Sequence, residues 1–281
     1  MSDLSDLHNL LSNEALSHYA SGREQERLSK GTGQLELVRT QEILSRYLPP
    51  PPAVIFDIGG GSGVYSCWLA QQGYEVHLID AVPLHVEQAR SFSQAQPSYP
   101  LASLAIGDAR QLNRANNSVD AVLLLGPLYH LTERTERIVA LREAHRILKT
   151  GGLAFAVGIS RFASTLDGLF SGYLDDPEFV GIVQQDLIDG QHRNPNNHPA
   201  YFTTAFLHHP EELKAEIKEA GLHFEQILSI EGPGWLLQNF ESNWNEQGRR
   251  DRLLKAIRWL ETEPSVLGIG AHIMAVACKR L

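Results

Sequence analysis

Cysteine is scarce in this sequence, and its scarcity excludes several classes of protein. Among the 281 residues there are two cysteines, Cys67 and Cys278. Two cysteines this far apart provide neither the framework of a disulfide-rich secreted domain nor a cysteine-rich metal site. We interpret both as ordinary buried side chains, which is the common state of an unpaired cysteine.

Long apolar runs are also missing. No stretch of about 18 uninterrupted apolar residues occurs, so the sequence predicts no membrane-spanning helix and no membrane partner. The polar start, residues 1–6, resembles neither a signal peptide nor a basic transit segment. We therefore expect an intracellular, cytoplasmic chain.

Basic residues are outnumbered, with 24 lysines and arginines against 33 acids and a net charge of −9. This balance repels a phosphate backbone, so nucleic acid is a disfavoured partner, although a local basic patch can override a net count. The apolar share of 43% suffices for an ordinary interior, and the length fits one α/β core with a cap.

What the sequence does contain is an apolar strand that runs directly into a glycine-rich turn. Residues 54–63 read Val-Ile-Phe-Asp-Ile-Gly-Gly-Gly-Ser-Gly, and a helix is expected over residues 64–72. Glycine has no Cβ and tolerates positive φ, so the backbone can approach a ligand while the next helix offers its N-terminus. The pattern is typical of a nucleotide-binding loop.

The glycine spacing argues against a dinucleotide. The pattern G-x-G-x-x-G would require glycine at position 64 or 66, where the sequence has Val64 and Ser66. A second apolar run, residues 75–79, ends in Asp80. An acidic side chain at that strand end can accept hydrogen bonds from both ribose hydroxyls. The pattern present is D-x-G-x-G-x-G, formed by Asp57, Gly59, Gly61 and Gly63.

This pattern and the segments after it resemble the class I S-adenosylmethionine-dependent methyltransferases. The resemblance extends over roughly residues 35–160 and rests on five motifs in the family's order. After the first two come residues 101–106 ending in Gly107-Asp108-Ala109, residues 118–125 ending in Gly126-Pro127-Leu128-Tyr129-His130-Leu131, and a helix over 132–148 leading to a fifth strand over 153–159.

The resemblance implies an α/β fold: a doubly wound, seven-stranded, mostly parallel sheet of the Rossmann-like methyltransferase type with helices on both faces. We expect residues 222–230 and 267–277 to close the sheet, the last strand running antiparallel beside the fifth. Four segments are expected: a helical lid (1–48), a cofactor-binding core (49–160), an inserted substrate cap (161–207) and the C-terminal part of the core sheet (208–281).

The same resemblance implies S-adenosylmethionine as the cofactor, with S-adenosylhomocysteine as product. The alternative for the acids is that they only cap strand ends, and for Asp57 a structural role is about as plausible. The resemblance implies that the backbone at Gly59, Gly61 and Gly63 approaches the cofactor and that Asp57 contacts the loop and the methionine amino group. It implies that Asp80 binds the ribose and that Asp108 and Ala109 contact the adenine. Leu125 and Gly126 would line the methionine portion.

Tyr19 and Arg27, both in the expected lid, are further cofactor-site candidates. Together with Glu24 they resemble the Tyr-x-x-x-x-Glu-x-x-Arg-Leu pattern at the start of similar small-molecule methyltransferases. Arg27 would pair with a carboxylate of cofactor or substrate, whereas the alternative is a solvated helix charge.

The candidate catalytic residues are His130, Tyr129 and His208. His130 lies where the resemblance places the reacting methyl group, and a neutral imidazole can accept a proton near neutral pH. Tyr129 would shape the pocket or hydrogen-bond the acceptor, and both also fit ordinary loop side chains. His208 is the second candidate base, with a helix-entry role as its alternative. A base is needed only where the acceptor must lose a proton.

Other histidines and aromatic residues have weaker interpretations. Four histidines match no compact ligand spacing and no cysteine joins them, so we expect no metal: His192, His198, His208 and His209. Four aromatic residues either wall an acceptor pocket or pack in the core: Tyr173, Phe179, Trp235 and Trp244.

The sequence thus predicts methyl transfer to a small-molecule acceptor, with oxygen, nitrogen, sulfur and carbon all open as the acceptor atom. Such transfer is an in-line displacement that depends mainly on positioning. The alternatives are a protein or RNA methyltransferase, a non-catalytic S-adenosylmethionine sensor and a dinucleotide oxidoreductase. An oligomer is possible, and its state is not predicted.

Overall fold

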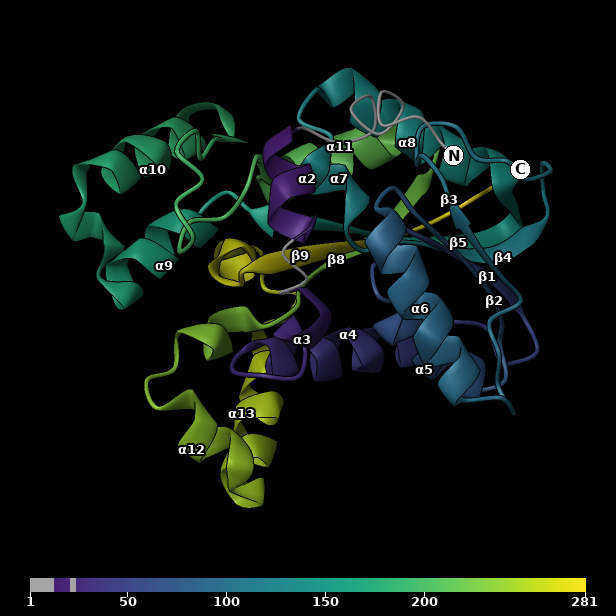
Figure 1. The fold of residues 1–281 in the computed structure, drawn as a ribbon, viewed down its shortest axis with the longest axis horizontal. Coiled ribbons are helices and arrows are strands. Elements are labelled where there is room, and N and C mark those ends of the chain that lie inside the picture. Colours follow the sequence, from purple (N-terminus) through teal and green to yellow (C-terminus); the bar gives the residue numbers. More distant parts are fainter. Residues whose placement is uncertain (1–12, 21–23) are drawn as a thin grey trace.

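Apolar strands alternating with amphipathic helices fold into a central sheet that is covered by helices on both faces (Figure 1). The computed structural model describes residues 13–20 and 24–281. Its mostly parallel sheet confirms the predicted α/β class. Parts of the expected lid fall in residues 1–12 and 21–23, which lie outside the described residues.

Five parallel strands form the core of the sheet in the order β3-β2-β1-β4-β5. The order reverses between β1 and β4, which creates a crevice at their carboxyl ends. The strands are β1 (Val54–Ile58), β2 (Glu75–Asp80), β3 (Ser103–Ile106), β4 (Val119–Leu124) and β5 (Leu148–Ser160).

The closing pair is antiparallel, as predicted. β9 (His272–Cys278) lies between β5 and β8 (His223–Ser229), with Ala156 of β5 opposite Ala275 of β9. β9 starts later than expected, because Pro264 opens a 3₁₀ turn, η3 (Pro264–Ile269), over the predicted beginning of this strand.

The described sheet has nine strands rather than seven, because the cap segment contributes a small hairpin. β6 (Gln191–His192) pairs with β7 (Ala205–His208), and β7 pairs with the end of β5 through Ser160 and His208. Ile159 of β5 pairs with β7 on one edge and with β9 on the other. β7 therefore pairs with the same edge of β5 as β4 does, beyond the carboxyl end of β4.

Helices cover the two faces of the sheet in separate layers (Figure 1). Side chains of successive strand residues point to opposite faces, so Ile55 packs with one layer and Phe56 with the other. One layer contains α4 (Gly33–Tyr47), α5 (Val64–Gln71) and α6 (Pro83–Ala95), and the other contains α8 (Arg134–Ile147) and α11 (Pro210–Glu219).

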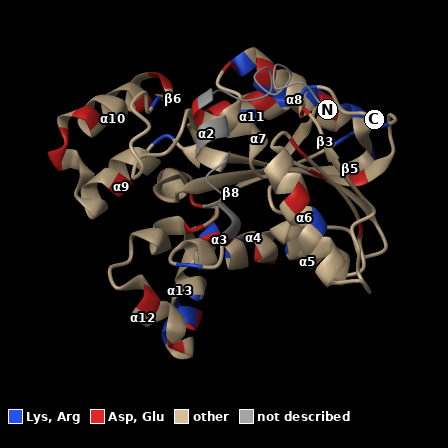
Figure 2. Ribbon diagram, in the orientation of Figure 1, with Lys and Arg blue, Asp and Glu red and all other residues tan. Residues whose placement is uncertain are grey.

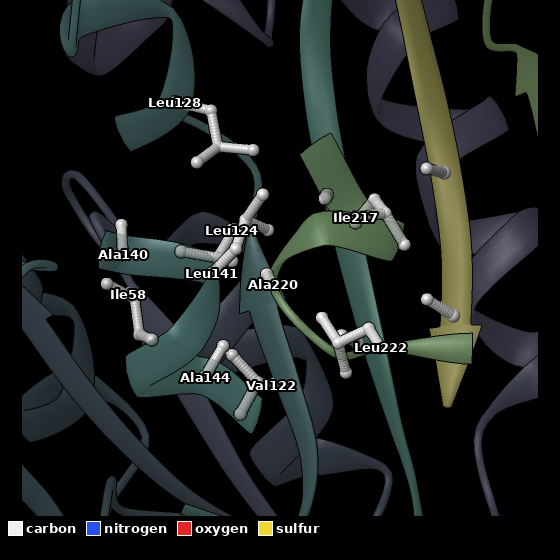
Figure 3. Packing of buried hydrophobic residues seen from close by; sticks show 14 of the residues in the cluster. Ile58, Val122, Leu124, Leu128, Ala140, Leu141, Ala144, Ile217, Ala220 and Leu222 are labelled. Atoms are coloured by element: carbon white, nitrogen blue, oxygen red, sulfur yellow. The ribbon is translucent and has the colours of Figure 1, made fainter. Parts of the chain in front are cut away.

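The α8 face shows how packing fixes the loop that follows β4. Figure 3 shows Leu141 and Ala144 of α8 beside Val122 and Leu124 of β4. These four side chains are fully buried, and burial of each leucine contributes about 2 kcal/mol. β4 therefore ends at a fixed position, from which the short helix α7 (Pro127–His130) presents Tyr129 and His130.

The cap segment (residues 161–207) projects beyond the sheet at the left of Figure 1. It contains α9 (Ala163–Ser171), η1 (Tyr173–Asp175) and α10 (Pro177–Asp189), with a small core of Phe179, Ile182, Val183 and Tyr201. This separate core gives the cap segment its own packing.

The N-terminal helices lie near the carboxyl end of the sheet. α2 (Asn13–Ala20) packs Ala15 and Tyr19 on Val82, and its Glu14 contacts the hydroxyl of Thr204 in the cap segment. The short α3 (Glu24–Arg27) follows. The function of these segments as lid and cap remains a prediction.

The remaining elements complete the C-terminal half: η2 (Gly232–Leu236), α12 (Phe240–Asn245) and α13 (Gln247–Leu260). No helix in the described part of the chain combines the length and apolar character needed to cross a membrane.

Candidate functional site

A cavity, here called the first cavity, opens at the carboxyl ends of β1, β2 and β4, where the strand order reverses. It brings together twelve of the residues proposed from the sequence: Tyr19, Arg27, Asp57, Gly59, Gly61, Asp80, Asp108, Ala109, Leu125, Gly126, Tyr129 and His130.

The glycine loop borders this cavity, but its three glycines differ in function. Gly61 has φ +57°, and a Cβ added there would meet no described atom within 4 Å, so its backbone faces open space. Gly59, at φ +69°, lies against Pro127, whose ring would be 2.9 Å from an added Cβ.

Gly63 corrects one expectation, because it does not line the cavity. It is the left-handed N-cap of α5, at φ +85°, and an added Cβ would lie 2.9 Å from the Cβ of Ala89 in α6. Gly63 therefore permits close packing of α5 against α6 rather than approach to a ligand.

Asp80 is held rigidly at the end of β2. One carboxylate oxygen accepts from the backbone N–H of Gly61 at 2.8 Å, and the other accepts from Val82 at 2.8 Å. The Nδ1 of His85 lies 3.1 Å from the second oxygen. A carboxylate has about four lone-pair sites and three are occupied here, so Asp80 retains capacity for one further donor, such as a ligand hydroxyl.

Asp57 is buried beneath the glycine loop. Its Oδ2 accepts from the Ser66 hydroxyl at 2.6 Å, while Oδ1 is buried with no hydrogen-bonding partner among the described residues. Burial and the nearby charge of Asp80 raise the pKa of Asp57 to about 7. A ligand that offers a donor or a positive charge would satisfy this oxygen.

Asp108 lies at the other end of the cavity and is fixed by Arg110. Its Oδ1 accepts from the backbone N–H of Arg110 at 2.8 Å, and the Arg110 side chain bonds both carboxylate oxygens. The neighbouring Ala109 is buried. These contacts hold the Asp108 carboxylate in one position at the edge of the cavity.

Tyr19 and His130 close the cavity from the side of α2. The Tyr19 hydroxyl lies 2.5 Å from Nε2 of His130, and the Tyr19 ring packs edge-on against His85 and His130 at about 5 Å. Burial lowers the pKa of His130 to about 4, against the opposing effects of the Thr204 backbone and the Asp80 charge. The imidazole is therefore neutral at pH 7, and its Nε2 can accept a hydrogen bond from the Tyr19 hydroxyl.

Arg27 forms an ion-pair network at the floor of the cavity. Its guanidinium pairs in a bidentate manner with Glu36, and Nδ1 of His272 lies 2.6 Å from Glu231. Glu231 and Glu36 raise the pKa of His272 in spite of its burial. Ligand atoms of Glu36, Glu231 and His272 lie within 4.8 Å of one another, yet Arg27 and His272 already neutralise both carboxylates.

The structure does not bring His208 to this site, which corrects the second catalytic candidate. Its fully buried imidazole lies on β7, with Nε2 3.3 Å from Glu216, and it lines neither this cavity nor the one described next. Glu216 also pairs with Arg137. The neighbouring His209 opens α11, where its backbone N–H donates to Glu212 at 2.8 Å.

A second cavity lies between the cap segment and the ends of β5 and β7. Tyr19, Arg27 and Tyr129 line both cavities, so the two adjoin. Of the aromatic residues proposed as a wall, Phe179 and Trp235 line the second cavity. Tyr173 instead packs on Phe179 and Tyr201 from outside that lining, and Trp244 stacks on Phe240.

Sequence reasoning missed several residues here, among them Glu36, His85 and His192. His85 was detectable, since it follows Asp80 by five residues at the first turn of the next helix. Glu36 was hidden among the charges of α4, and His192 was considered only as a metal ligand. Nothing in the local sequence identifies the last two.

Residues 56–156 match the family model described as "Methyltransferase domain". The chain is 30% identical over 122 residues to a ubiquinone/menaquinone biosynthesis C-methyltransferase of Acidiphilium cryptum, covering 43% of this chain and 48% of the relative. It is 27% identical to a ubiquinone biosynthesis O-methyltransferase of Xanthomonas axonopodis pv. citri, covering 69% and 72%. The chain thus spans about half the length of the first of these relatives.

The fold is shared with solved structures. A S-adenosylmethionine-dependent methyltransferase from Methanosarcina mazei superposes with a TM-score of 0.57 over 85% of this chain and 97% of that one, at 19% sequence identity. At that identity the likeness establishes the arrangement of the sheet and helices.

Proposed function

Because this chain belongs to the class I S-adenosylmethionine-dependent methyltransferases through its domain at residues 56–156, we propose that it transfers the methyl group of S-adenosylmethionine to a small-molecule acceptor. The observation that carries the proposal is the junction of the two cavities at Tyr19, Arg27 and Tyr129. One cavity has the groups a donor requires, and the other offers room for an acceptor beside it.

The residues of the first cavity fit the donor. When bound, S-adenosylmethionine supplies an electrophilic methyl group on a sulfonium sulfur. Asp80 would accept from a hydroxyl of its ribose, and the unpartnered Oδ1 of Asp57 would accept from its ammonium group. Gly61 leaves the backbone open toward the cavity, and Asp108 with Ala109 would border the adenine.

Tyr19 and His130 form a route for a proton. Tyr19 borders both cavities, and its hydroxyl already donates to the neutral imidazole of His130. In the proposed step the acceptor gives its proton to the Tyr19 oxygen while the Tyr19 proton moves to Nε2 of His130. An acceptor that needs no deprotonation would use these groups only for positioning.

A small molecule is favoured over RNA by the shape and charge of the chain. The second cavity is lined mainly by residues of the cap segment and has the size of a small-molecule site. Figure 2 shows acidic and basic residues interspersed along α8, α11 and α13, without a continuous basic face in that view. The relatives named for ubiquinone biosynthesis also suggest a small acceptor.

Calorimetry with S-adenosylhomocysteine and NADH tests the donor assignment. We expect S-adenosylhomocysteine to bind and NADH not to bind. Asp80→Ala should weaken the binding by at least about ten-fold, because the variant loses the ribose acceptor and the anchor of Gly61. Asp251→Ala, an exposed acid on α13, is the matched control and should bind normally.

Binding of NADH in place of S-adenosylhomocysteine would contradict the proposal. Tight binding without methyl transfer to any of a broad panel of acceptors would instead support a sensor.

A further inference from the structure

Two polar side-chain atoms in the second cavity are buried without a partner. They are Nε2 of His192 and Oγ of Ser164, and neither has a hydrogen-bonding partner among the described residues. Both residues line the cavity, with exposures of 2% and 8%. Unpartnered polar atoms in such a place cost stability unless a ligand or water bonds to them.

Asp186 determines what His192 can offer. The wholly buried carboxylate of Asp186 lies 2.8 Å from Nδ1 of His192, so a neutral imidazole carries its proton on Nδ1. Nε2 of His192, a residue of the cavity lining, then carries the lone pair and can accept a hydrogen bond. The pairing of His192 with Ala205 in the β6–β7 hairpin holds the backbone in place.

Ser164 and Asp167 define the α9 side of the cavity. The Ser164 hydroxyl can both donate and accept one hydrogen bond. Asp167 lies one helical turn further on and also lines the cavity, and burial raises the pKa of its carboxyl. The positive groups of the lining, Arg27 and His272, are already paired with Glu36 and Glu231. An anionic ligand therefore finds no unpaired positive charge in the described lining.

The rest of the lining is largely apolar and aromatic. Aromatic rings accommodate a flat ring by stacking and edge contacts. The aromatic members are Tyr19, Tyr129, Phe179, Tyr201, Phe202 and Trp235.

We propose that the second cavity binds an uncharged aromatic acceptor that carries a hydroxyl group, and that His192 and Ser164 are its specificity determinants. This hydroxyl, a recognition group distinct from the atom that gives its proton to Tyr19, donates to Nε2 of His192 and accepts a hydrogen bond from the Ser164 hydroxyl. This inference rests on the proposed function, since it assigns the acceptor to the cavity beside the donor. His192 lines only the second cavity and His130 only the first, so His192 recognises the acceptor while His130 belongs to the proton route.

Three probes of similar size separate the contributions to binding: phenol, toluene and benzoate. Their affinities are measured by calorimetry at pH 8, where a neutral imidazole is the usual state, with and without saturating S-adenosylhomocysteine. We expect phenol to bind about ten-fold more tightly than toluene, because only phenol donates to His192. Benzoate should bind most weakly, since its carboxylate would lie near the acceptor Nε2 of His192 and the carboxyl of Asp167.

His192→Asn is the informative variant. The asparagine amide can still donate to Asp186, but the variant lacks the Nε2 acceptor of the imidazole. It should weaken phenol binding about ten-fold, leave toluene unchanged and keep the affinity for S-adenosylhomocysteine within about two-fold. His223→Asn, a half-exposed histidine on β8, is the matched control, and Ser164→Ala is a second, smaller substitution that should weaken phenol alone.

Equal affinities of phenol and toluene, tight binding of benzoate, or unchanged phenol binding in both His192→Asn and Ser164→Ala would each overturn the inference. The measurements without S-adenosylhomocysteine keep the two proposals apart. A failure of S-adenosylhomocysteine to bind would contradict the proposed function, while the difference between phenol and toluene would still report on the cavity.

Discussion

At the scale of single residues, the two carboxylates of the first cavity have different environments. Asp80 accepts from two backbone N–H groups, whereas Asp57 has one donor and one oxygen without a partner among the described residues. The pKa of Asp57 is raised from 3.8 to about 7, which corresponds to about 4 kcal/mol. The folded protein therefore keeps a proton on Asp57 that the unfolded chain releases at much lower pH.

The first prediction concerns Asp57→Asn. Between pH 3.8 and about 7 the unfolded chain ionises while the folded carboxyl stays protonated, so wild-type stability falls as pH rises through this range. Asparagine cannot ionise, so the gain in melting temperature of the variant over wild type should be larger at pH 8 than at pH 5. At pH 8, where the Asp57 carboxyl is ionised, the affinity for S-adenosylhomocysteine should drop about ten-fold, because the ammonium loses a charged partner.

Thermal scans at the two pH values and calorimetry measure these effects. An equal difference in melting temperature between Asp57→Asn and wild type at both pH values would contradict the raised pKa of Asp57.

The second prediction concerns His130, whose pKa burial lowers from 6.5 to about 4. Its NMR resonance should not titrate between pH 8 and pH 5 and should move only near pH 4. His130→Ala should reduce kcat about 100-fold with S-adenosylhomocysteine binding unchanged, because the variant loses the proton acceptor but not the donor site. A titration midpoint near 6.5, or full turnover in the variant, would exclude this assignment.

Some residues of the first cavity were predictable from the local sequence, and others were not. Asp57, Asp80 and Asp108 were detectable because the ends of parallel strands converge at one edge of a sheet. The distinction between Gly61 and Gly63 was not, since it depends on Ala89 of another helix. Likewise, the position of His208 was not predictable, because its imidazole contacts Glu216 of α11 instead of lining the cavity.

At the scale of elements, a buried ion pair joins α8 to α11. Arg137 and Glu216 are each about 1% exposed and form a bidentate pair, and the guanidinium also lies 3.6 Å from the centroid of the Phe206 ring. Helical periodicity cannot reveal a buried arginine, because the partner that permits its burial lies 79 residues away.

The third prediction follows from this pair. Glu216→Gln leaves the Arg137 charge buried without its counterion and should lower the free energy of unfolding by about 3 kcal/mol. Glu219→Gln, on the same helix but half-exposed, should cost less than about 1 kcal/mol. Urea denaturation measures both. The double variant Arg137→Met/Glu216→Leu should recover most of the loss, and a cost as small as that of Glu219→Gln would show that the pair contributes little.

The β6–β7 hairpin marks the limit of prediction at the element scale. The parallel core was predictable because each strand shows an apolar run followed by a turn signal. β6 has two residues within a polar stretch, too few for any periodicity, and it exists because Gln191 and His192 pair with Phe206 and Ala205.

At the scale of the whole molecule, the excess of acids governs the choice of partner. The net charge of −9 gives an overall repulsion toward polyanions. The fourth prediction is that a labelled RNA hairpin binds with a dissociation constant weaker than about 100 µM at physiological salt. Fluorescence anisotropy tests this, with a basic RNA-binding protein as positive control. Micromolar binding that weakens steeply with salt would revive RNA as the acceptor.

The contact between the two cavities is narrow: among the described residues, Tyr19, Arg27 and Tyr129 are those that line both. The remaining acceptor-side lining comes mainly from the cap segment, whose core packs separately from the sheet. Under the proposed function, substitutions in the cap segment would change which acceptor binds while leaving the proposed donor site intact, because no cap-segment residue lines the first cavity in the described part of the chain.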